Sequence, residues 1–376
     1  MYIESARAPS SASLFTRLAR GLNLDVPLLI GLILLSGVGL IVLYSASGES
    51  TALLYRQFVR LGISFLVLIF VAQLSPHFLR MWTPWIFAVG TLLLVIVLYE
   101  GDIGKGAQRW LDLGVIRFQP SEIMKLAVPM MVAWYLHEKP LPPSFWQLIL
   151  MGLIVVIPVV LIAKQPDLGT ALLIGSAGAF AVFLSGLRWR MIFLILAMLG
   201  AAAPIVWKFF MREYQRQRVL TFLNPESDPL NTGYHIIQSK IAIGSGGLFG
   251  KGWLNGTQSQ LDFLPERSTD FIFAVLGEEF GLLGVLVVLL IYAYVIARGL
   301  YIASQAEKTY GRILAGSLIL TFFVYLFVNV GMVSGLLPVV GVPLPLISYG
   351  GTSMVTLMAG FGILMSIHSH RKLMTR

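Results

Sequence analysis

Residues 271–296 read FIFAVLGEEFGLLGVLVVLLIYAYVI, and their only charged side chains are Glu278 and Glu279. A helix needs about 20 mostly apolar residues to cross the hydrocarbon core of a bilayer. This run is long enough, and a helix that is apolar all round has no face to turn towards water. It therefore predicts a transmembrane helix.

The rest of the chain repeats this pattern. Of its 376 residues, 57% are hydrophobic and 12% are charged, whereas soluble domains are typically about 45–50% apolar and about 25% charged. The sequence predicts an all-α polytopic membrane protein with about ten spans, forming a single integral membrane domain over residues 1–376. The expected spans are 27–47, 57–75, 82–99, 120–136, 146–163, 169–186, 190–208, 271–296, 312–335 and 347–366.

The distribution of charge predicts the orientation of these spans. If the N-terminus is cytoplasmic, thirteen Lys and Arg residues and four acidic residues fall on the inner side, which accounts for the whole formal net charge of +9. An excess of Lys and Arg in cytoplasmic loops is the usual pattern of membrane proteins. Residues 1–24 and 367–376 are then cytoplasmic, and the polar loops 100–119 and 209–270 are extracytoplasmic. The basic pI of about 9.7 needs no nucleic-acid partner to explain it.

Asp270 is the most suggestive acid of the larger loop. It is the last polar residue before the apolar run that begins at Phe271, so it lies at the membrane face. One interpretation is an N-cap, because Asp accepts backbone N–H bonds at the start of a helix. The other is a general base beside a lipid-borne substrate. Both interpretations remain open from the residues alone.

Glu278 and Glu279 lie deeper in the same expected span. Acids within a membrane usually face the bundle interior and pair with another polar group. We expect a structural intramembrane pair, held by a buried base or amide such as Lys125 or Asn329, in preference to a catalytic role.

The smaller loop and the span that follows it hold a second group of polar residues. Arg109 offers two parallel donors to a phosphate, and Trp110 is either an interface residue or part of a site. Gln119 and Glu122 stand at the expected start of a helix, and Lys125 lies one turn further in. A buried Lys needs an anion, which is either Glu122 or a ligand.

A third group is basic. Lys208, Arg212 and Arg216 are spaced at i, i+4 and i+8, so on a helix that continues the seventh span they form one stripe. Such residues either snorkel to lipid headgroups or bind a diphosphate.

Several collinear runs resemble the SEDS family, and within it the RodA branch more than the FtsW branch. The similarity covers nearly the whole chain. The runs are GAQRWL…RFQPSE (106–122), KQPDLGT (164–170), NTGYH…QS (231–239), GTQSQLDFLPERSTDFIFAVLGEEFG (256–281) and PLPLISYGGTS (343–353).

This resemblance implies a peptidoglycan glycosyltransferase of the bacterial plasma membrane. It implies polymerisation of lipid II at the outer face for cell elongation and rod shape, together with a class B penicillin-binding protein and other membrane proteins of the elongation complex. The acid of the family motif that ends T-D-F falls on Asp270, and the important Trp of its first outer loop falls on Trp110. Lys240 and Gln258, in or beside the quoted runs, are added as candidate substrate-binding residues.

Glycosyl transfer from a lipid diphosphate needs a carboxylate base, cations for the leaving group and a groove for the lipid. One carboxylate suffices, because a diphosphate leaves without the protonated acid that a glycosidase uses. The expected reaction is inverting, without a covalent intermediate. A divalent cation, Mg²⁺ or Mn²⁺, is the only cofactor considered, and its ligands are not apparent from the sequence. The alternatives are a lipid II flippase, because intramembrane acids also suit transport, and a non-catalytic scaffold.

Overall fold

The computed structural model describes residues 22–104, 107–112, 117–211, 213–227, 232–261, 263–264 and 266–370. Ten helices within these ranges correspond one to one with the ten expected spans, and most of their ends differ from the prediction by a few residues. They are α2 (Val26–Ala46), α3 (Thr51–Gln73), α4 (Pro76–Glu100), α5 (Pro120–Leu136), α6 (Phe145–Lys164), α7 (Leu168–Phe183), α8 (Trp189–Ile205), α12 (Ile272–Ser304), α13 (Thr309–Val333) and α14 (Thr352–Ser369).

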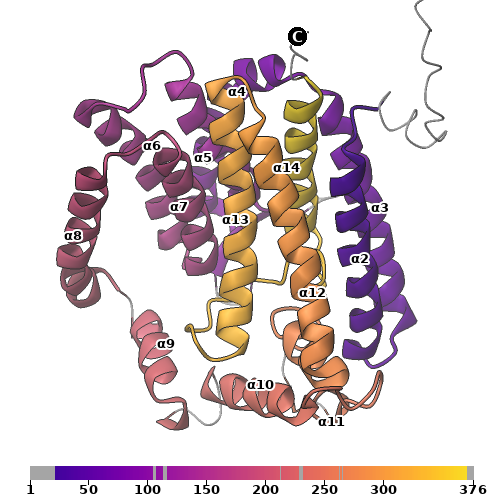
Figure 1. Ribbon diagram of the computed structural model, residues 1–376. Coiled ribbons are helices and arrows are strands. Elements are labelled where there is room, and N and C mark those ends of the chain that lie inside the picture. The colour runs from indigo at the N-terminus through magenta and orange to yellow at the C-terminus, as the bar shows by residue number, and fades with distance from the viewer. Residues whose placement is uncertain are drawn as a thin grey trace, which may run out of the picture.

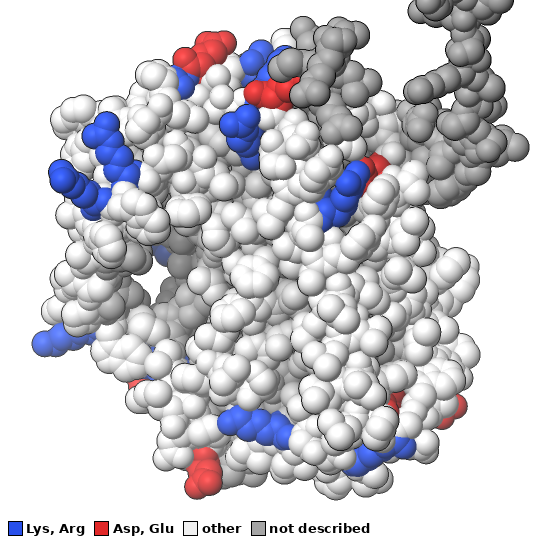
Figure 2. Space-filling view, viewed as in Figure 1, with Lys and Arg blue, Asp and Glu red and all other residues white. Residues whose placement is uncertain are grey.

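Eight candidate spans within the described residues are long and apolar enough to cross a membrane, and α7 is a shorter apolar helix. Figure 1 shows α12, α13 and α14 packed beside α2 and α3, with α8 standing apart at the left. In Figure 2 most of the visible charged side chains gather towards the two ends of the bundle, and the broad band between them is largely uncharged. This is the surface that a polytopic membrane protein requires.

The first and last of these helices meet at one end of the bundle. The Ser369 hydroxyl donates to the carbonyl of Asn23 (2.9 Å). Beside it, Arg298 donates two hydrogen bonds to the carboxylate of Asp25 (3.0 and 2.7 Å). Helices α10 (Thr232–Gly246) and α11 (Thr257–Gln260) lie at the opposite end (Figure 1). The start of α2 and the end of α14 therefore share one face, as an even number of crossings demands.

The all-α polytopic fold class is confirmed, and the smaller polar loop adds short strands to it. This loop forms a three-stranded antiparallel sheet of β1 (Asp102–Gly104), β2 (Ala107–Asp112) and β3 (Arg117–Phe118). Trp110 is the cross-strand partner of Asp102. Strands of two or three residues are too short to leave a periodic hydrophobic signal, and the six residues of β2, AQRWLD, do not alternate between apolar and polar side chains.

The larger loop is mostly helical. It contains α9 (Glu213–Leu223), a 3₁₀ turn (Pro225–Ser227), α10 and α11. Helix α12 is also broken near its start: Gly281 has φ 63° and ψ −165°, a conformation open to glycine but strained for other residues. Glu278 and Glu279 lie in the short helical segment that precedes this break.

The last expected span begins late, because α14 starts at Thr352 and not at residue 347. The non-helical residues before it are held by hydrogen bonds. Gln57 donates to the carbonyl of Ser348 (3.2 Å) and accepts from the N–H of Gly350 (3.4 Å). Buried backbone outside helices must find such partners, and this segment lies beside the candidate site.

Candidate functional site

Asp270 lies in a turn that is fastened to the non-helical segment before α14. Asn329 of α13 donates from Nδ2 to the carbonyl oxygen of Asp270 (2.9 Å) and to that of Val342 (2.7 Å). The Ser348 hydroxyl donates to the carbonyl of Thr269 (2.6 Å). The Asp270 backbone is therefore fixed by α13 on one side and by the 338–351 segment on the other.

The side chain of Asp270 is not the N-cap of α12, which corrects that interpretation. The helix begins at Ile272, and its N-cap is Phe271, without a side-chain capping bond. Asp270 is half-buried, and its Oδ2 points towards Gly341, 3.4 Å from the position that a Cβ would take there. A partly exposed carboxylate on a rigid backbone can accept a proton from a substrate hydroxyl.

His235, which belongs to the NTGYH run but was not among the candidate residues, lies beside this turn. Its ring stacks on Phe271 with the centroids 5.5 Å apart and the planes 19° apart. Burial lowers the pKa of the His235 imidazole, and the negative charge of Glu266 opposes that effect only in part. Burial therefore favours a neutral ring next to the Asp270 turn.

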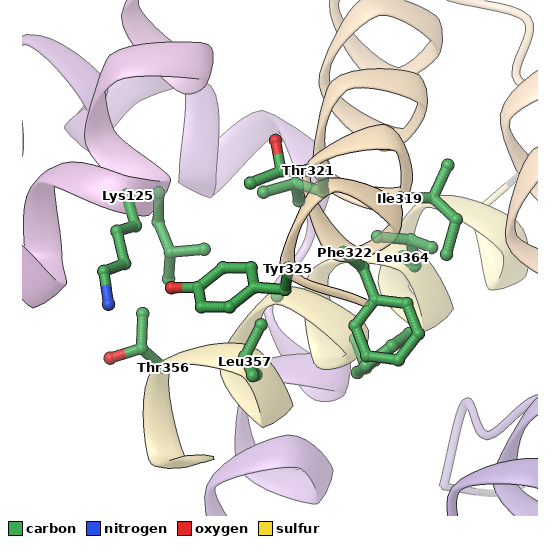
Figure 3. A pocket seen from close by; sticks show the side chains of 12 residues that line it. Lys125, Ile319, Thr321, Phe322, Tyr325, Thr356, Leu357 and Leu364 are labelled. Carbon is green, nitrogen blue, oxygen red and sulfur yellow. The ribbon is translucent and has the colours of Figure 1, made fainter. Parts of the chain in front are cut away.

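A second polar group occupies the interior of the bundle at α5. Lys125 Nζ lies 2.7 Å from Glu122 Oε1, and both side chains are buried. The same ammonium lies 5.4 Å from the ring centroid of Tyr325. Figure 3 shows the Lys125 side chain beside the Tyr325 hydroxyl and Thr356, at the rim of a mostly apolar pocket. That pocket lies between α5, α13 and α14 and encloses about 400 Å³ including its open side.

Arg109 and Gln119 both contact Asp167, which was not predicted to be a substrate-binding residue. Arg109 Nε lies 3.5 Å from Asp167 Oδ2, and its guanidinium donates to the carbonyl of Pro166 (3.2 Å). Gln119 donates to the same Asp167 oxygen (3.3 Å). A phosphate would have to compete with Asp167 for Arg109.

Helix α13 connects the two groups. Tyr325, beside Lys125, and Asn329, which holds Asp270, are four residues apart and lie on one face of α13. Their Cα atoms are separated by about 6 Å along the helix axis, from a rise of about 1.5 Å per residue. The Lys125–Glu122 pair and the Asp270 turn are therefore neighbours across one turn of α13.

The acids in α12 have different partners from those that we expected. Glu278 accepts from Lys251 (2.8 Å), from Thr257 (3.1 Å) and from the N–H of Gln258 (2.9 Å). Glu279 accepts from the Ser45 hydroxyl. Neither Lys125 nor Asn329 is a partner among these contacts, because the break at Gly281 lets the outer loop fold back over the start of α12.

The described residues do not form the continuous helix that the predicted basic stripe requires. A π-helical turn (Val206–Phe210) follows α8, and α9 begins only at Glu213. Arg216 folds back to donate to the carbonyls of Trp207 (3.0 Å) and Lys208 (2.8 Å). The Arg216 guanidinium therefore satisfies two carbonyls at the end of the π-helical turn and is not aligned with Lys208 along one helix face. Arg212 lies outside the described residues.

The remaining candidate residues occupy separate places. Lys240 is exposed on α10, and its Nζ lies 2.8 Å from the position that a Cβ would take at Gly335, just after α13. Gln258 is tied to Glu278 through its backbone.

Among the described residues no group of three or more His, Asp or Glu side chains is arranged to hold a metal ion. Mg²⁺ is usually bound by one or two carboxylates together with substrate phosphates.

These features define a polytopic α-helical membrane protein with acids and bases gathered towards one end of the bundle. The chain belongs to the cell cycle protein family of FtsW, RodA and SpoVE, whose model matches residues 24–373. The peptidoglycan glycosyltransferase MrdB of Escherichia coli K12 is 53% identical over 354 residues, covering 94% of this chain and 96% of that protein. A probable peptidoglycan glycosyltransferase FtsW of Geobacter metallireducens is 35% identical over 366 residues, covering 93% and 95%.

Solved structures agree with this membership. A chain of a peptidoglycan synthase complex, described as coordinating polymerisation and crosslinking, superposes with a TM-score of 0.81 at 32% identity, covering 93% of this chain and 98% of that one. The rod shape determining protein RodA of Thermus thermophilus gives a TM-score of 0.70 at 30% identity, covering 92% and 97%. The RodA branch is thus supported by both sequence and structure.

Proposed function

We propose that this chain is a peptidoglycan glycosyltransferase that polymerises lipid II at the outer face of the bacterial plasma membrane, with Asp270 as the general base. The observation that carries the proposal is the fixed position of Asp270, whose backbone is bonded to Asn329 at the end of the bundle that holds α10 and α11. The 53% identity to a peptidoglycan glycosyltransferase over most of the chain supports the same reaction.

In the proposed reaction, a hydroxyl of the acceptor sugar loses its proton to the Asp270 carboxylate. The hydroxyl oxygen forms a bond to the anomeric carbon of the donor, and the bond from that carbon to the lipid diphosphate breaks. The diphosphate leaves with the electron pair, and positive groups stabilise its charge. Lys125 and Arg109 are the candidates for this role, although each already has a carboxylate partner. A single direct displacement inverts the anomeric centre. We predict that Mg²⁺ or Mn²⁺ enters the site together with the diphosphate.

We also propose a class B penicillin-binding protein as the partner, since the superposed synthase complex is described as joining polymerisation to crosslinking. Both termini are proposed to be cytoplasmic, which the positive charge of the predicted inner side supports. Other membrane proteins of the elongation machinery and membrane lipids are expected neighbours.

The test is polymerisation of lipid II by the purified protein in detergent, with and without a cognate class B penicillin-binding protein. Glycan strands are expected, and the reaction needs no sealed membrane. A lipid II flippase would produce no glycan in this assay, and neither would a scaffold. Absence of glycan with a folded protein and its partner would therefore contradict the enzyme proposal.

A further inference from the structure

A large pocket lies at the end of the bundle opposite α10 and α11, away from Asp270. It encloses about 1260 Å³ including its open mouth. Four parts of the chain line it: the start of α4, the end of α5, the connection from α12 to α13, and the end of α14. Under the predicted orientation this end is cytoplasmic, so the reaction proposed above does not use the pocket.

Two helices begin at the wall of this pocket. Helix α4 starts at Pro76 and α13 starts at Thr309, and both residues line the pocket. The N-cap of α13 is Lys308, which makes no side-chain capping bond, whereas the N-cap of α4, Ser75, accepts from the N–H of Phe78 (3.2 Å). The first N–H groups of a helix are unsatisfied within the helix and carry partial positive charge. Arg80 and Lys308 add two full positive charges to the same wall.

Three histidines also line the pocket, and two of them have one ring nitrogen already bonded. His137 Nδ1 lies 2.6 Å from the carbonyl of Trp134, and His370 Nδ1 lies 2.9 Å from that of Ser366. A carbonyl only accepts, so each Nδ1 carries the proton. The Nε2 atoms can then donate to a ligand only when the ring is protonated. His77, at the start of α4, is exposed.

The negative groups of the pocket are few. Glu138 lies 3.0 Å from His137 Nε2, and 80% of its side chain is exposed. Glu307 is exposed beside Lys308. The Tyr310 hydroxyl is occupied by Thr83 (3.1 Å). The net charge of the pocket therefore depends on its histidines. With neutral rings, Arg80 and Lys308 balance Glu138 and Glu307. With protonated rings, the pocket is positive.

From the cavity and this set of donors, we infer that the pocket is a binding site for a phosphate-bearing anion, held by Arg80, Lys308 and the protonated His370. Arg and Lys form charge-assisted hydrogen bonds to phosphate, and the N-terminus of α13, which has no side-chain cap, favours the same charge. Such a phosphate comes either from the headgroup of an anionic phospholipid of the inner leaflet or from a soluble phosphate compound.

The test titrates the purified full-length protein in detergent with three probes: short-chain phosphatidylglycerol, phosphatidylcholine of the same chain length, and inorganic phosphate. The shift of the thermal unfolding midpoint gives the apparent affinity at pH 6 and pH 8. We expect phosphatidylglycerol to stabilise the protein more at pH 6, because its phosphodiester carries the same charge at both pH values while the histidines gain protons. Inorganic phosphate becomes a dianion between pH 6 and pH 8, so it serves only to assign the source. Stabilisation by phosphatidylglycerol but not by inorganic phosphate assigns a lipid headgroup, and stabilisation by inorganic phosphate assigns a soluble source.

The variants identify the site. Lys308→Gln should weaken binding by about tenfold, the usual loss for one hydrogen bond to a charged group, and Arg80→Gln with Lys308→Gln by more. His370→Gln should reduce the difference between pH 6 and pH 8. Lys139→Gln is the matched control, because Lys139 lies at the same end but packs over the ring of Tyr135 and should bind as the unmodified protein does. No stabilisation by any probe would overturn the inference. So would equal affinity for phosphatidylglycerol at both pH values, or unchanged affinity in Lys308→Gln, a substitution at an exposed side chain.

Discussion

Asn329 and Asp270 are joined by a hydrogen bond from the Asn329 amide to the Asp270 carbonyl oxygen, at 2.9 Å. The same amide nitrogen donates to Val342 at 2.7 Å, so one side chain aligns the proposed base with the segment opposite it. Asn329 is fully buried. It acts as a positioning residue, because it holds the backbone of the proposed base.

We expect Asn329→Ala to lower the turnover number by about 10²-fold, because a displacement of about 1 Å at a reacting group can cost that much. The KM should change little, since no substrate contact is removed. Ser334→Ala is the control, because the Ser334 hydroxyl bonds only within its own helix end, to Val330 and Gly331. An unchanged turnover number in folded Asn329→Ala would remove Asn329 from the account.

Substitutions in the Lys125–Glu122 pair test whether this pair only stabilises the fold or also binds the diphosphate. Removing one partner of a buried ion pair strands the other charge and typically costs about 3–5 kcal/mol. Glu122→Gln should therefore be strongly destabilising, and adding Lys125→Met should recover much of the thermal stability. We expect the double variant to fold but to turn over lipid II poorly, because the diphosphate loses a cation. Polymerisation at the unmodified rate by the double variant would make the pair purely structural.

Asp25 predicts how stability depends on pH at the opposite end of the bundle. Burial by itself raises the pKa of Asp25, but hydrogen bonds from Arg298 and from the N–H of Leu28, and the charge of Arg298, lower it below the ordinary value of 3.8. A carboxyl with a depressed pKa stabilises the fold fully above the unfolded value, and this stabilisation is lost as the pH falls through the lower folded value. Asp25→Asn should therefore unfold at a lower temperature than the unmodified protein at pH 7. The gap should narrow as the pH falls below the ordinary value of 3.8, and an equal gap at pH 7 and pH 3 would contradict this.

The absence of cysteine makes the orientation directly measurable. Phe249 is 79% exposed in the turn after α10, and Ser304 is exposed at the end of α12. In intact cells an impermeant thiol reagent should label Phe249→Cys, whereas Ser304→Cys should react only after the membrane is opened. The reverse pattern would place the proposed active site in the cytoplasm.

The sequence was sufficient to locate the helices, because each membrane crossing needs an apolar run of fixed minimum length. It could not locate the break at Gly281, since one glycine inside an apolar run gives no sign that its φ is positive. The partners of Glu278 were mispredicted for this reason: Lys251 reaches it only once the outer loop folds back over α12.

The site was predictable in part. Asp270 was marked by its place at the end of a polar loop, and Lys125 by the cost of burying a charge. Tyr325 and Asp167 were missed, because their roles depend on contacts between residues far apart in the chain. The spacing of Lys208, Arg212 and Arg216 predicted one continuous helix. The chain leaves the helical conformation at Met211, between Lys208 and Arg216.

The central claim is tested most directly by the rate of lipid II polymerisation by Asp270→Asn, measured with purified protein and its penicillin-binding partner. Asn keeps nearly the same volume, and the hydrogen bond from Asn329 is made to the backbone, so folding and partner binding should be unchanged. The carboxylate that accepts the proton is lost, and general-base assistance is worth about 10²–10⁴-fold in rate. Glu266→Gln, at an exposed acid in the same turn, is the matched control and should stay close to the unmodified rate. The account predicts a loss of at least about 10²-fold for Asp270→Asn, and a rate equal to that of Glu266→Gln would contradict it.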